Sequence, residues 1–562
     1  MSLRVFLRNK GAPLQGRSTL TRSGQALRPY VMPVLLVVLA LAARLIPGPR
    51  TIDDAFITFR YARSLLAGNG FVYNAGERVL GTTTPLYTLL MAGLASLIGG
   101  INAPFPTLAL LVNALADAGT CLLLWQLGKR INAERVGIAA ALIWAVAPFS
   151  VTFAIGGLET SVYVLLLTAA VWAYVTRRHT LSALCAALAL LTRPDALILI
   201  LPLAAVRLGH SIAVPLHKNA NRPGSSKFLA FLRAFGMDNP APLTWGEIAA
   251  FVLPVAAWFG FAWAYFGSPI PHSVAAKLIT YHLAPGSAFI RLIQHYTTPF
   301  MENDLLGSAA AVGIGLVLYP FLFIVGARRA WKNDRNLLVW IAYPWLYFAT
   351  FALPNPLLFR WYLTPPLPAY FFFILMGLDQ VLTSIFARAK VPAIHPLPAW
   401  RTWVVTALLI VLPLVPTLSD WQIHPDHGAD RPAPQMAFIK LELLYRQAAD
   451  YLSPQLTSNT LLAAGDVGVL GFYTPARILD TVGLNSPVSL NYYPLDDRYY
   501  AINYAIPADL VLDQKPDFVV ILEVYGRLTL LKDPHFLAQY ELLQTLPTDI
   551  YGSNGMLIFK RK

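Results

Sequence analysis

Long apolar stretches separated by short polar loops dominate the chain between residues 31 and 419. Most of these stretches approach the length of about 20 residues that an α-helix needs to cross a membrane. The pattern therefore predicts a polytopic α-helical membrane protein with about eleven membrane segments. The predicted segments are Val31–Ile46, Thr107–Leu127, Arg135–Phe153, Thr160–Val175, Leu181–Leu191, Ala196–Val206, Glu247–Phe266, Leu306–Ala327, Asn336–Phe351, Trp361–Phe386 and Thr402–Leu418.

One further apolar stretch, Pro85–Ile98, is too short to cross a membrane easily. If it did cross, the basic pair Lys129-Arg130 would lie outside the cell, and so would Arg177-Arg178. We therefore expect Pro85–Ile98 to be a juxtamembrane helix on the outer face.

The composition agrees with a membrane protein, because 56% of the 562 residues are hydrophobic and only 13% are charged. The net charge of +14 arises from Lys and Arg in particular loops. It indicates membrane topology and gives no support for nucleic-acid binding. Cys121 and Cys185 both lie in apolar segments, so they imply no disulfide framework.

Basic residues identify the predicted cytoplasmic side. Residues 1–30 contain several Arg and Lys residues and no acidic one, and the long loop 207–244 is also basic. Because positive loops stay in the cytoplasm, the N-terminus should be cytoplasmic. Residues 420–562 should then be extracytoplasmic, on a multi-pass protein of the plasma (inner) membrane.

The C-terminal part is more polar than the rest of the chain. It combines a helical stretch, Met436–Tyr451, with strand-like runs at Thr460–Ala464, Asp517–Leu522 and Gly555–Phe559. This mixture predicts a small soluble α/β domain. The chain is thus divided into a basic N-terminus (1–30), a transmembrane domain (31–419) and an extracytoplasmic domain (420–562).

Two adjacent acids, Asp53 and Asp54, follow the first apolar segment, where charge is costly unless it has a function. Thr51 and Asp54 have the spacing of a capping box, which gives Asp54 a structural alternative. On a helix Asp53 and Arg60 are separated by about 20°, so they share one face. The opposite face is apolar, which predicts an amphipathic helix lying on the membrane with its polar face turned to the protein. A surface ion pair is the alternative role for Asp53.

Neighbouring side chains on a helix diverge by about 100°, so Asp53 and Asp54 cannot face each other across one substrate bond. One of them acting as a general base fits better, with the other orienting it or holding a cation.

The predicted topology brings further charged residues to the outer face. Each has a structural alternative: Glu159 can compensate a helix dipole, Arg193 can pair with Asp195, Lys277 can be solvated, and Arg360 can extend to the membrane surface. As positive groups near a lipid phosphate, Lys277 and Arg360 would instead bind substrate.

Several motifs together resemble the GT-C membrane glycosyltransferases, and most of all the mycobacterial terminal arabinofuranosyltransferases. More distantly, the arrangement is similar to bacterial aminoarabinose transferases and protein mannosyltransferases. The motifs are DDAFITFRYAR (53–63), GFVYNAGERVLGTTTPL (70–86), GLET (157–160), TRPD (192–195), PHSVAAK (271–277), RWYLTPPLP (360–368) and GDVGVLGFY (465–473).

The resemblance implies an outer-face acid that acts as base and a sugar donor carried on a polyprenyl phosphate. Asp53 matches the first acid of the motif. Two departures bear on which sugar or acceptor is handled: His272-Ser273 replaces an expected Asn-Thr-like pair, and residues 82–84 are all Thr.

These observations predict an inverting glycosyltransferase that moves a sugar, such as the pentose arabinofuranose, from a polyprenyl-phosphate donor to a glycan, lipid or protein acceptor of the cell envelope. Asp53 and Asp54 are the catalytic candidates, and a divalent cation could bind Asp53, Asp54 and Glu159. The substrate- and phosphate-binding candidates are Arg60, Glu159, Arg193, His272, Lys277, Arg360 and Tyr362. The alternatives are a transporter or flippase of lipid-linked sugars, and a membrane-anchored protein that binds through its C-terminal domain.

Overall fold

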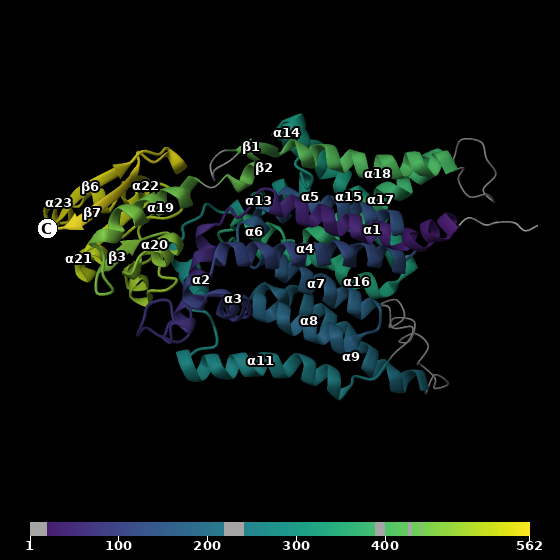
Figure 1. Cartoon of the computed structure of the whole chain (residues 1–562), viewed down its shortest axis with the longest axis horizontal. Helices are drawn as coiled ribbons and strands as arrows, with labels where there is room; N and C mark the ends of the chain where they lie inside the picture. The colour runs from purple at the N-terminus through teal and green to yellow at the C-terminus, as the bar shows by residue number, and fades with distance from the viewer. Residues whose placement is uncertain (1–18, 219–240, 388–398, 425–429, 439) are drawn as a thin grey trace, which may run out of the picture.

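The computed structural model describes residues 19–218, 241–387, 399–424, 430–438 and 440–562. It consists of a long helical bundle with a mixed α/β domain at one end (Figure 1). The basic N-terminal residues 1–18 and the basic loop residues 219–240 lie outside the described residues, as do Arg388 and Lys390.

Helices occupy all of the predicted membrane segments. Only five of the described helices are long and apolar enough to cross a membrane by themselves, or six if α5 and α6, which meet at a 46° bend, form one span. The chain is thus a multi-pass membrane protein, but the count of eleven is not established. The helices are α1 (Thr19–Leu45), α4 (Phe105–Arg130), α5 (Glu134–Val146), α6 (Pro148–Ile155), α7 (Thr160–Val175), α8 (His179–Thr192), α9 (Leu197–Lys218), α11 (Trp245–Phe266), α15 (Ser308–Asn333), α16 (Leu338–Ala352), α17 (Leu367–Ala387) and α18 (Ala399–Ser419).

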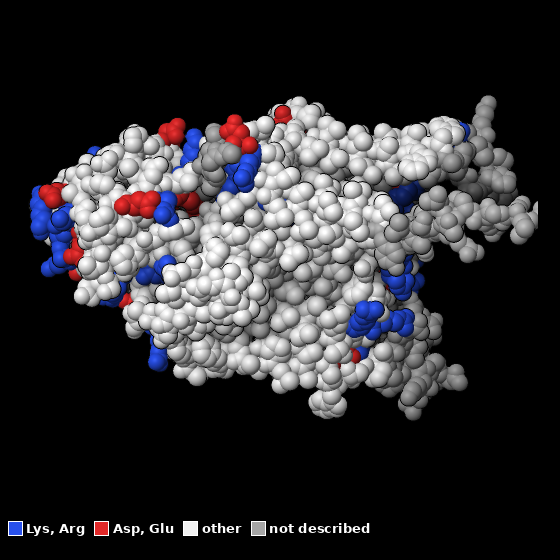
Figure 2. Space-filling model, in the orientation of Figure 1, with Lys and Arg blue, Asp and Glu red and all other residues white. Residues whose placement is uncertain are grey.

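The surface of the bundle is divided by charge. A broad uncharged zone covers its middle, and Lys and Arg gather at the end far from the α/β domain (Figure 2). Lys129 and Arg130 in the last turn of α4 and Lys332 in the last turn of α15 belong to the basic end. This separation is the one expected of a protein whose basic end faces the cytoplasm.

Two short helices, α2 (Asp53–Leu66) and α3 (Pro85–Ile98), lie between the bundle and the α/β domain (Figure 1). The predicted short helix at Pro85–Ile98 is confirmed with the same bounds. The prediction for α2 is wrong in one respect. Its polar face, including Asp53 and Arg60, is turned to the protein as predicted, but its apolar face is also buried within the protein at Ala55, Phe59 and Ala62 and does not lie on the membrane surface.

The C-terminal domain contains a five-stranded mixed sheet in the order β4-β3-β5-β7-β6. The strands β3 (Leu461–Ala464), β4 (Arg477–Asp480) and β5 (Phe518–Leu522) are parallel, whereas β7 (Met556–Arg561) is antiparallel to β5 and to β6 (Tyr540–Leu546). Three of these strands and the helix α19 (Lys440–Leu452) overlap the predicted elements. A two-stranded ribbon, β1 (Trp421–His424) and β2 (Arg431–Pro434), connects the domain to α18.

A buried polar network joins four helices of the bundle, α1, α4, α5 and α7. Arg44 of α1 and Asp117 of α4 are fully buried, and Arg44 Nε donates to Asp117 Oδ2 over 2.9 Å. Trp144 Nε1 and Ser161 Oγ also donate to the Asp117 carboxylate, at 3.1 and 2.9 Å. A buried charge is tolerated when it is paired and hydrogen-bonded in this way.

Replacing only one partner of the Arg44–Asp117 pair should strongly destabilise the protein. Arg44→Met leaves the Asp117 carboxylate buried without its cation, and we expect the free energy of unfolding to fall by about 3–5 kcal/mol. The double variant Arg44→Met/Asp117→Leu should lose much less. Thermal unfolding of the detergent-solubilised protein measures both, and Arg498→Ala, which removes an exposed pair with Asp496, is the control that should change nothing measurable. Equal losses in the single and double variants would contradict this account.

Candidate active site

A cavity of about 300 Å³ lies where the bundle meets α2 and the segment 356–362. It brings together five of the predicted site residues: Asp54, Glu159, Arg193, Lys277 and Tyr362. Thr82, Thr83, Thr84 and Ser273 also line it, so all but His272 of the positions at which the sequence departs from the resembling family border this cavity.

The break between α8 and α9 delivers Arg193 to the cavity. Pro194 disfavours the helical conformation of the residue before it, and Arg193 is extended, with φ −155° and ψ 136°. Its Nε and Nη2 atoms donate to the two carboxylate oxygens of Asp195, at 2.9 and 3.1 Å. The predicted pairing with Asp195 therefore exists, and it leaves the outer edge of the guanidinium facing Glu159 and Tyr362.

The remaining contacts of Arg193 are looser. Nη1 is 3.5 Å from Glu159 Oε1, and the guanidinium lies 4.5 Å from the centre of the Tyr362 ring. Nη1 is buried, and within the described residues it finds no hydrogen-bond partner. An unsatisfied buried donor next to a cavity is well suited to an anion.

Lys277, on α12 (His272–Thr280), is the second cation of the cavity. Its Nζ lies 5.2 Å from the ring centre of Phe359 and 5.7 Å from that of Tyr362. Burial acts to lower the pKa of Lys277, but Tyr362 and Asp54 outweigh it and raise the pKa above the ordinary value. Burial raises the pKa of Asp54, and the Lys277 charge opposes this shift. The two charges therefore attract each other inside the cavity.

Asp53 points away from this cavity. Its Oδ2 and Oδ1 atoms accept backbone N–H groups from Gly468 and Val469, each at 2.8 Å, at the start of α20 (Gly468–Tyr473). The predicted capping box is also wrong, because α2 begins at Asp53 without a side-chain hydrogen bond at its N-cap residue, Ile52. Both oxygens of Asp53 thus bind backbone groups of the C-terminal domain and lie outside the small cavity; its role as the base stays a prediction.

Arg60, a predicted phosphate ligand, lies outside the small cavity and donates to protein groups. Its Nε donates to the Tyr73 carbonyl at 2.7 Å, Nη1 to the Gly471 carbonyl at 2.5 Å, and Nη2 to Asn74 Oδ1 and the Ala476 carbonyl at 3.0 Å each. No ion pair joins it to Asp53 within the described residues. Arg60 connects α2 and the following loop to the C-terminal domain.

Two other predicted residues lie outside the small cavity. Arg360 borders a different, larger cavity. The backbone N–H of His272 donates to the Leu80 carbonyl at 2.8 Å, and burial lowers the pKa of its half-buried ring.

The expected cation site is not assembled. Among the described residues, no group of three or more His, Cys, Asp and Glu side chains has an arrangement that could hold a metal ion. The physical reason is that Asp53 is turned toward α20, away from Asp54 and Glu159.

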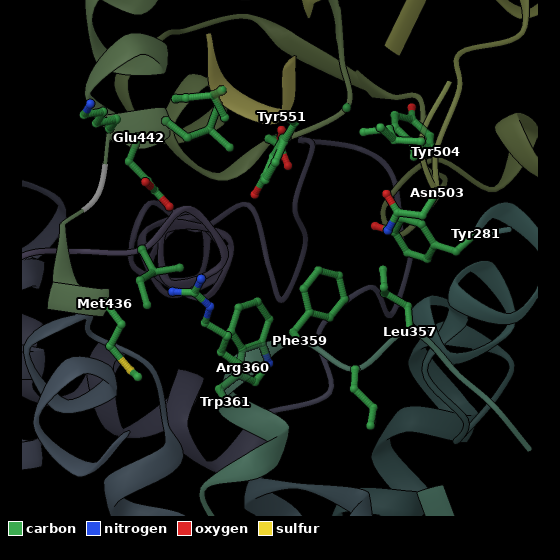
Figure 3. A pocket seen from close by; sticks show the side chains of 18 of the residues that line it. Tyr281, Leu357, Phe359, Arg360, Trp361, Met436, Glu442, Asn503, Tyr504 and Tyr551 are labelled. Atoms are coloured by element: carbon green, nitrogen blue, oxygen red, sulfur yellow. The ribbon is translucent and has the colours of Figure 1, made fainter. Parts of the chain in front are cut away.

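The larger cavity, of about 840 Å³, lies between the bundle and the C-terminal domain. Glu442 and Tyr551 enter it from the C-terminal domain, opposite Phe359, Arg360 and Trp361 (Figure 3). Trp361 and Leu357 border both cavities, which makes the two neighbours.

Sequence reasoning missed the residues that the C-terminal domain contributes to this cavity, notably Glu442 and Asp466. The only signal for Asp466 was its place in the motif at 465–473. Nothing in the sequence near Glu442 distinguishes it from a solvated acid on a helix.

The Glu442 side chain provides a test of the contact between the C-terminal domain and α2. Burial raises its pKa from 4.5 to about 7, so between these values the folded protein keeps a proton that the unfolded chain has lost. The free energy of unfolding should therefore fall as pH rises through this window.

Glu442→Gln cannot ionise and can still accept the Asp53 N–H group that Glu442 Oε1 accepts at 3.2 Å. Melting temperatures at about pH 5 and about pH 8 should differ less in this variant than in the wild type. Glu541→Gln, at an exposed position, is the control. If the melting temperature of Glu442→Gln depends on pH as strongly as that of the wild type, the raised pKa of Glu442 is refuted.

Comparison with known proteins relates the chain to membrane glycosyltransferases. The profile of a domain of unknown function (DUF8728) matches residues 435–559. Over 236 residues, 40% of this chain, the sequence is 30% identical to the terminal β-(1→2)-arabinofuranosyltransferase of Mycobacterium tuberculosis. The match spans about a third (34%) of that protein's length.

Two solved structures share the fold. ArnT from Cupriavidus metallidurans, bound to undecaprenyl phosphate, gives a TM-score of 0.54 at 13% identity and covers 95% of this chain and 98% of its own. The oligosaccharyltransferase AglB from Archaeoglobus fulgidus, in complex with an inhibitory peptide and a dolichol-phosphate, gives 0.51 at 11% identity over 89% of this chain and 70% of its own. All three proteins are GT-C glycosyltransferases. The predicted resemblance is thereby confirmed: the chain has the fold of the GT-C membrane glycosyltransferases.

Proposed function

We propose that this protein is an inverting glycosyltransferase that takes a sugar from a polyprenyl-phosphate donor at the outer face of the plasma membrane. The observation that carries the proposal is the small cavity at the end of the membrane helices, where Asp54 lies with two cations, Lys277 and Arg193, and where Asp195 and Glu159 lie beside Arg193. In this proposal the N-terminus is cytoplasmic and residues 420–562 form the extracytoplasmic domain.

The two cations fit the phosphate of a lipid-linked donor. Arg193 is fixed by Asp195 while its buried Nη1 remains without a hydrogen-bond partner among the described residues, and Lys277 adds a second charge. A guanidinium and an ammonium group stabilise the charge that develops on a departing phosphate. The undecaprenyl phosphate bound to ArnT supports a donor of this chemical class.

In the proposed reaction Asp54 is the general base. An acceptor hydroxyl loses its proton to the Asp54 carboxylate as its oxygen forms a bond to the anomeric carbon of the donor sugar. The bond from this carbon to the phosphate oxygen breaks at the same time, and the electron pair leaves with polyprenyl phosphate. Attack from the side opposite the phosphate inverts the anomeric configuration. Because the predicted cation ligands do not converge, no step is assigned to a metal ion.

The larger cavity suits the acceptor. Aromatic rings from both sides, including Tyr281, Phe359 and Tyr551, offer flat apolar surfaces on which sugar rings can rest. The shared wall of Trp361 and Leu357 would let an acceptor hydroxyl approach a sugar held in the small cavity. The arabinofuranosyltransferase relative supports a pentose donor and a cell-envelope glycan acceptor.

Replacing the proposed base should remove activity without unfolding the protein. Asp54→Asn keeps the size of the side chain but cannot accept the proton, and we expect transfer to slow by about 10²–10⁴-fold. The assay follows polyprenyl phosphate released from a synthetic polyprenyl-phospho-arabinofuranose. Melting temperature serves as the control, together with Asp509→Asn at an exposed position. Near-normal transfer by Asp54→Asn would exclude Asp54 as the base.

The phosphate-binding role of Lys277 requires a separate test. Lys277→Met retains much of the apolar stem but lacks the charge, so affinity for polyprenyl phosphate should fall by about tenfold or more. Asp54→Asn should not weaken this affinity, since it removes a negative charge from the same cavity. Equal binding of polyprenyl phosphate by Lys277→Met and wild type, measured by ligand-induced thermal stabilisation, would contradict the assignment.

A further inference from the structure

The motif at 465–473 lies in the C-terminal domain, but its contacts are with α2. Besides the two N–H groups that bind Asp53, Gly468 lies directly against the backbone of Asp53. A Cβ atom at position 468 would be 1.8 Å from the Asp53 carbonyl oxygen. Only glycine allows the two backbones to approach this closely.

The rest of the motif is held just as firmly. Tyr73 Oη donates to the Val467 carbonyl at 2.6 Å, and Arg60 Nη1 donates to the Gly471 carbonyl at 2.5 Å. The Phe472 ring packs against the rings of Phe56 and Phe59, with centroids 5.3 and 6.3 Å apart. The motif is thereby fixed relative to α2, and so is any side chain that it carries.

Asp466 is the charged side chain of this motif. It precedes the residues that hold α2 and borders the larger cavity together with Glu442. Tyr445 Oη donates to its Oδ2 atom at 2.9 Å. Burial raises the pKa of Asp466 to about 6, with added repulsion from Asp54 and Asp480. The side chain is therefore a hydrogen-bond acceptor placed at the edge of the cavity and within the electrostatic influence of Asp54.

We propose that Asp466 binds and orients a hydroxyl group of the acceptor, so that the C-terminal domain supplies part of the active site. This inference rests on the proposed glycosyltransferase function and adds a positioning residue to it.

Acids of the C-terminal domain line the larger cavity. Asp466, Glu442 and Asp549 line it together with the cations Arg291, Arg360 and Lys440, whereas Lys277 and Arg193 line the small cavity. Carboxylates repel a phosphate group but accept hydrogen bonds from neutral hydroxyl groups. A polyhydroxylated neutral acceptor is thus the ligand class that the Asp466 side of the larger cavity recognises best.

The test separates acceptor binding from donor binding. Steady-state transfer is measured from synthetic polyprenyl-phospho-arabinofuranose to a synthetic octyl arabinofuranosyl oligosaccharide. In Asp466→Asn the acceptor KM should rise by about ten- to a hundredfold, because a hydrogen bond to a charged group is weakened, while the donor KM stays unchanged. Tyr445→Phe, which removes the group that orients Asp466, should raise the acceptor KM by less. Asp466→Glu should restore part of the loss.

Other outcomes would overturn the inference. A normal acceptor KM in Asp466→Asn would exclude the role, and so would an equal rise of both KM values, which would indicate structural damage. If Asp466→Asn does not fold, the same comparison is made with Tyr445→Phe: a raised acceptor KM with an unchanged donor KM supports the inference, and any other result contradicts it. Failure of the proposed function looks different, since the wild-type protein would then release no polyprenyl phosphate with any sugar donor.

Discussion

Burial of two opposite charges on α2, each stabilised by backbone groups of the C-terminal domain, is the constraint on which the rest of the site depends. Asp53 accepts the N–H groups of Gly468 and Val469, and Arg60 donates to the Gly471 and Ala476 carbonyls. Leaving either charge buried without these partners would be strongly unfavourable. The helix that carries Asp54 is therefore positioned by a domain far from it in sequence.

The two cavities then acquire different chemistry from different parts of the chain. The small cavity takes its cations from the α8–α9 break and α12, whereas the larger one takes its acids from the C-terminal domain. The segment 356–362 contributes to both and forms the boundary between them. In the proposed reaction this arrangement would keep the lipid-linked donor and the acceptor apart until their reacting atoms meet near Trp361 and Leu357, which border both cavities.

The sequence predicted the helices well because every membrane span meets the same requirement: its side chains are apolar and its backbone hydrogen bonds are made within the helix. Hydropathy detects such stretches directly. It also predicted that Glu159, Arg193, Lys277 and Tyr362 converge near the acidic motif. It failed for Arg60, because the polar face of α2 is satisfied by carbonyl groups about 400 residues later in the chain. Helix periodicity identifies a polar face but cannot tell whether water, lipid or another domain covers it.

The same limit of helix periodicity applies to the choice between Asp53 and Asp54 as the base. Helix geometry correctly implied that Asp53 and Asp54 point in different directions, but it could not say which direction holds the substrate. Once α20 occupies the direction of Asp53, the divergence of about 100° between neighbours turns Asp54 toward Lys277 and the small cavity. Burial and the charge of Asp466 raise the pKa of Asp53, so position rather than proton affinity distinguishes the two acids: both oxygens of Asp53 already accept N–H groups of α20, whereas Asp54 lines the small cavity. The acid that holds the C-terminal domain and the acid that lines the small cavity are therefore separate residues.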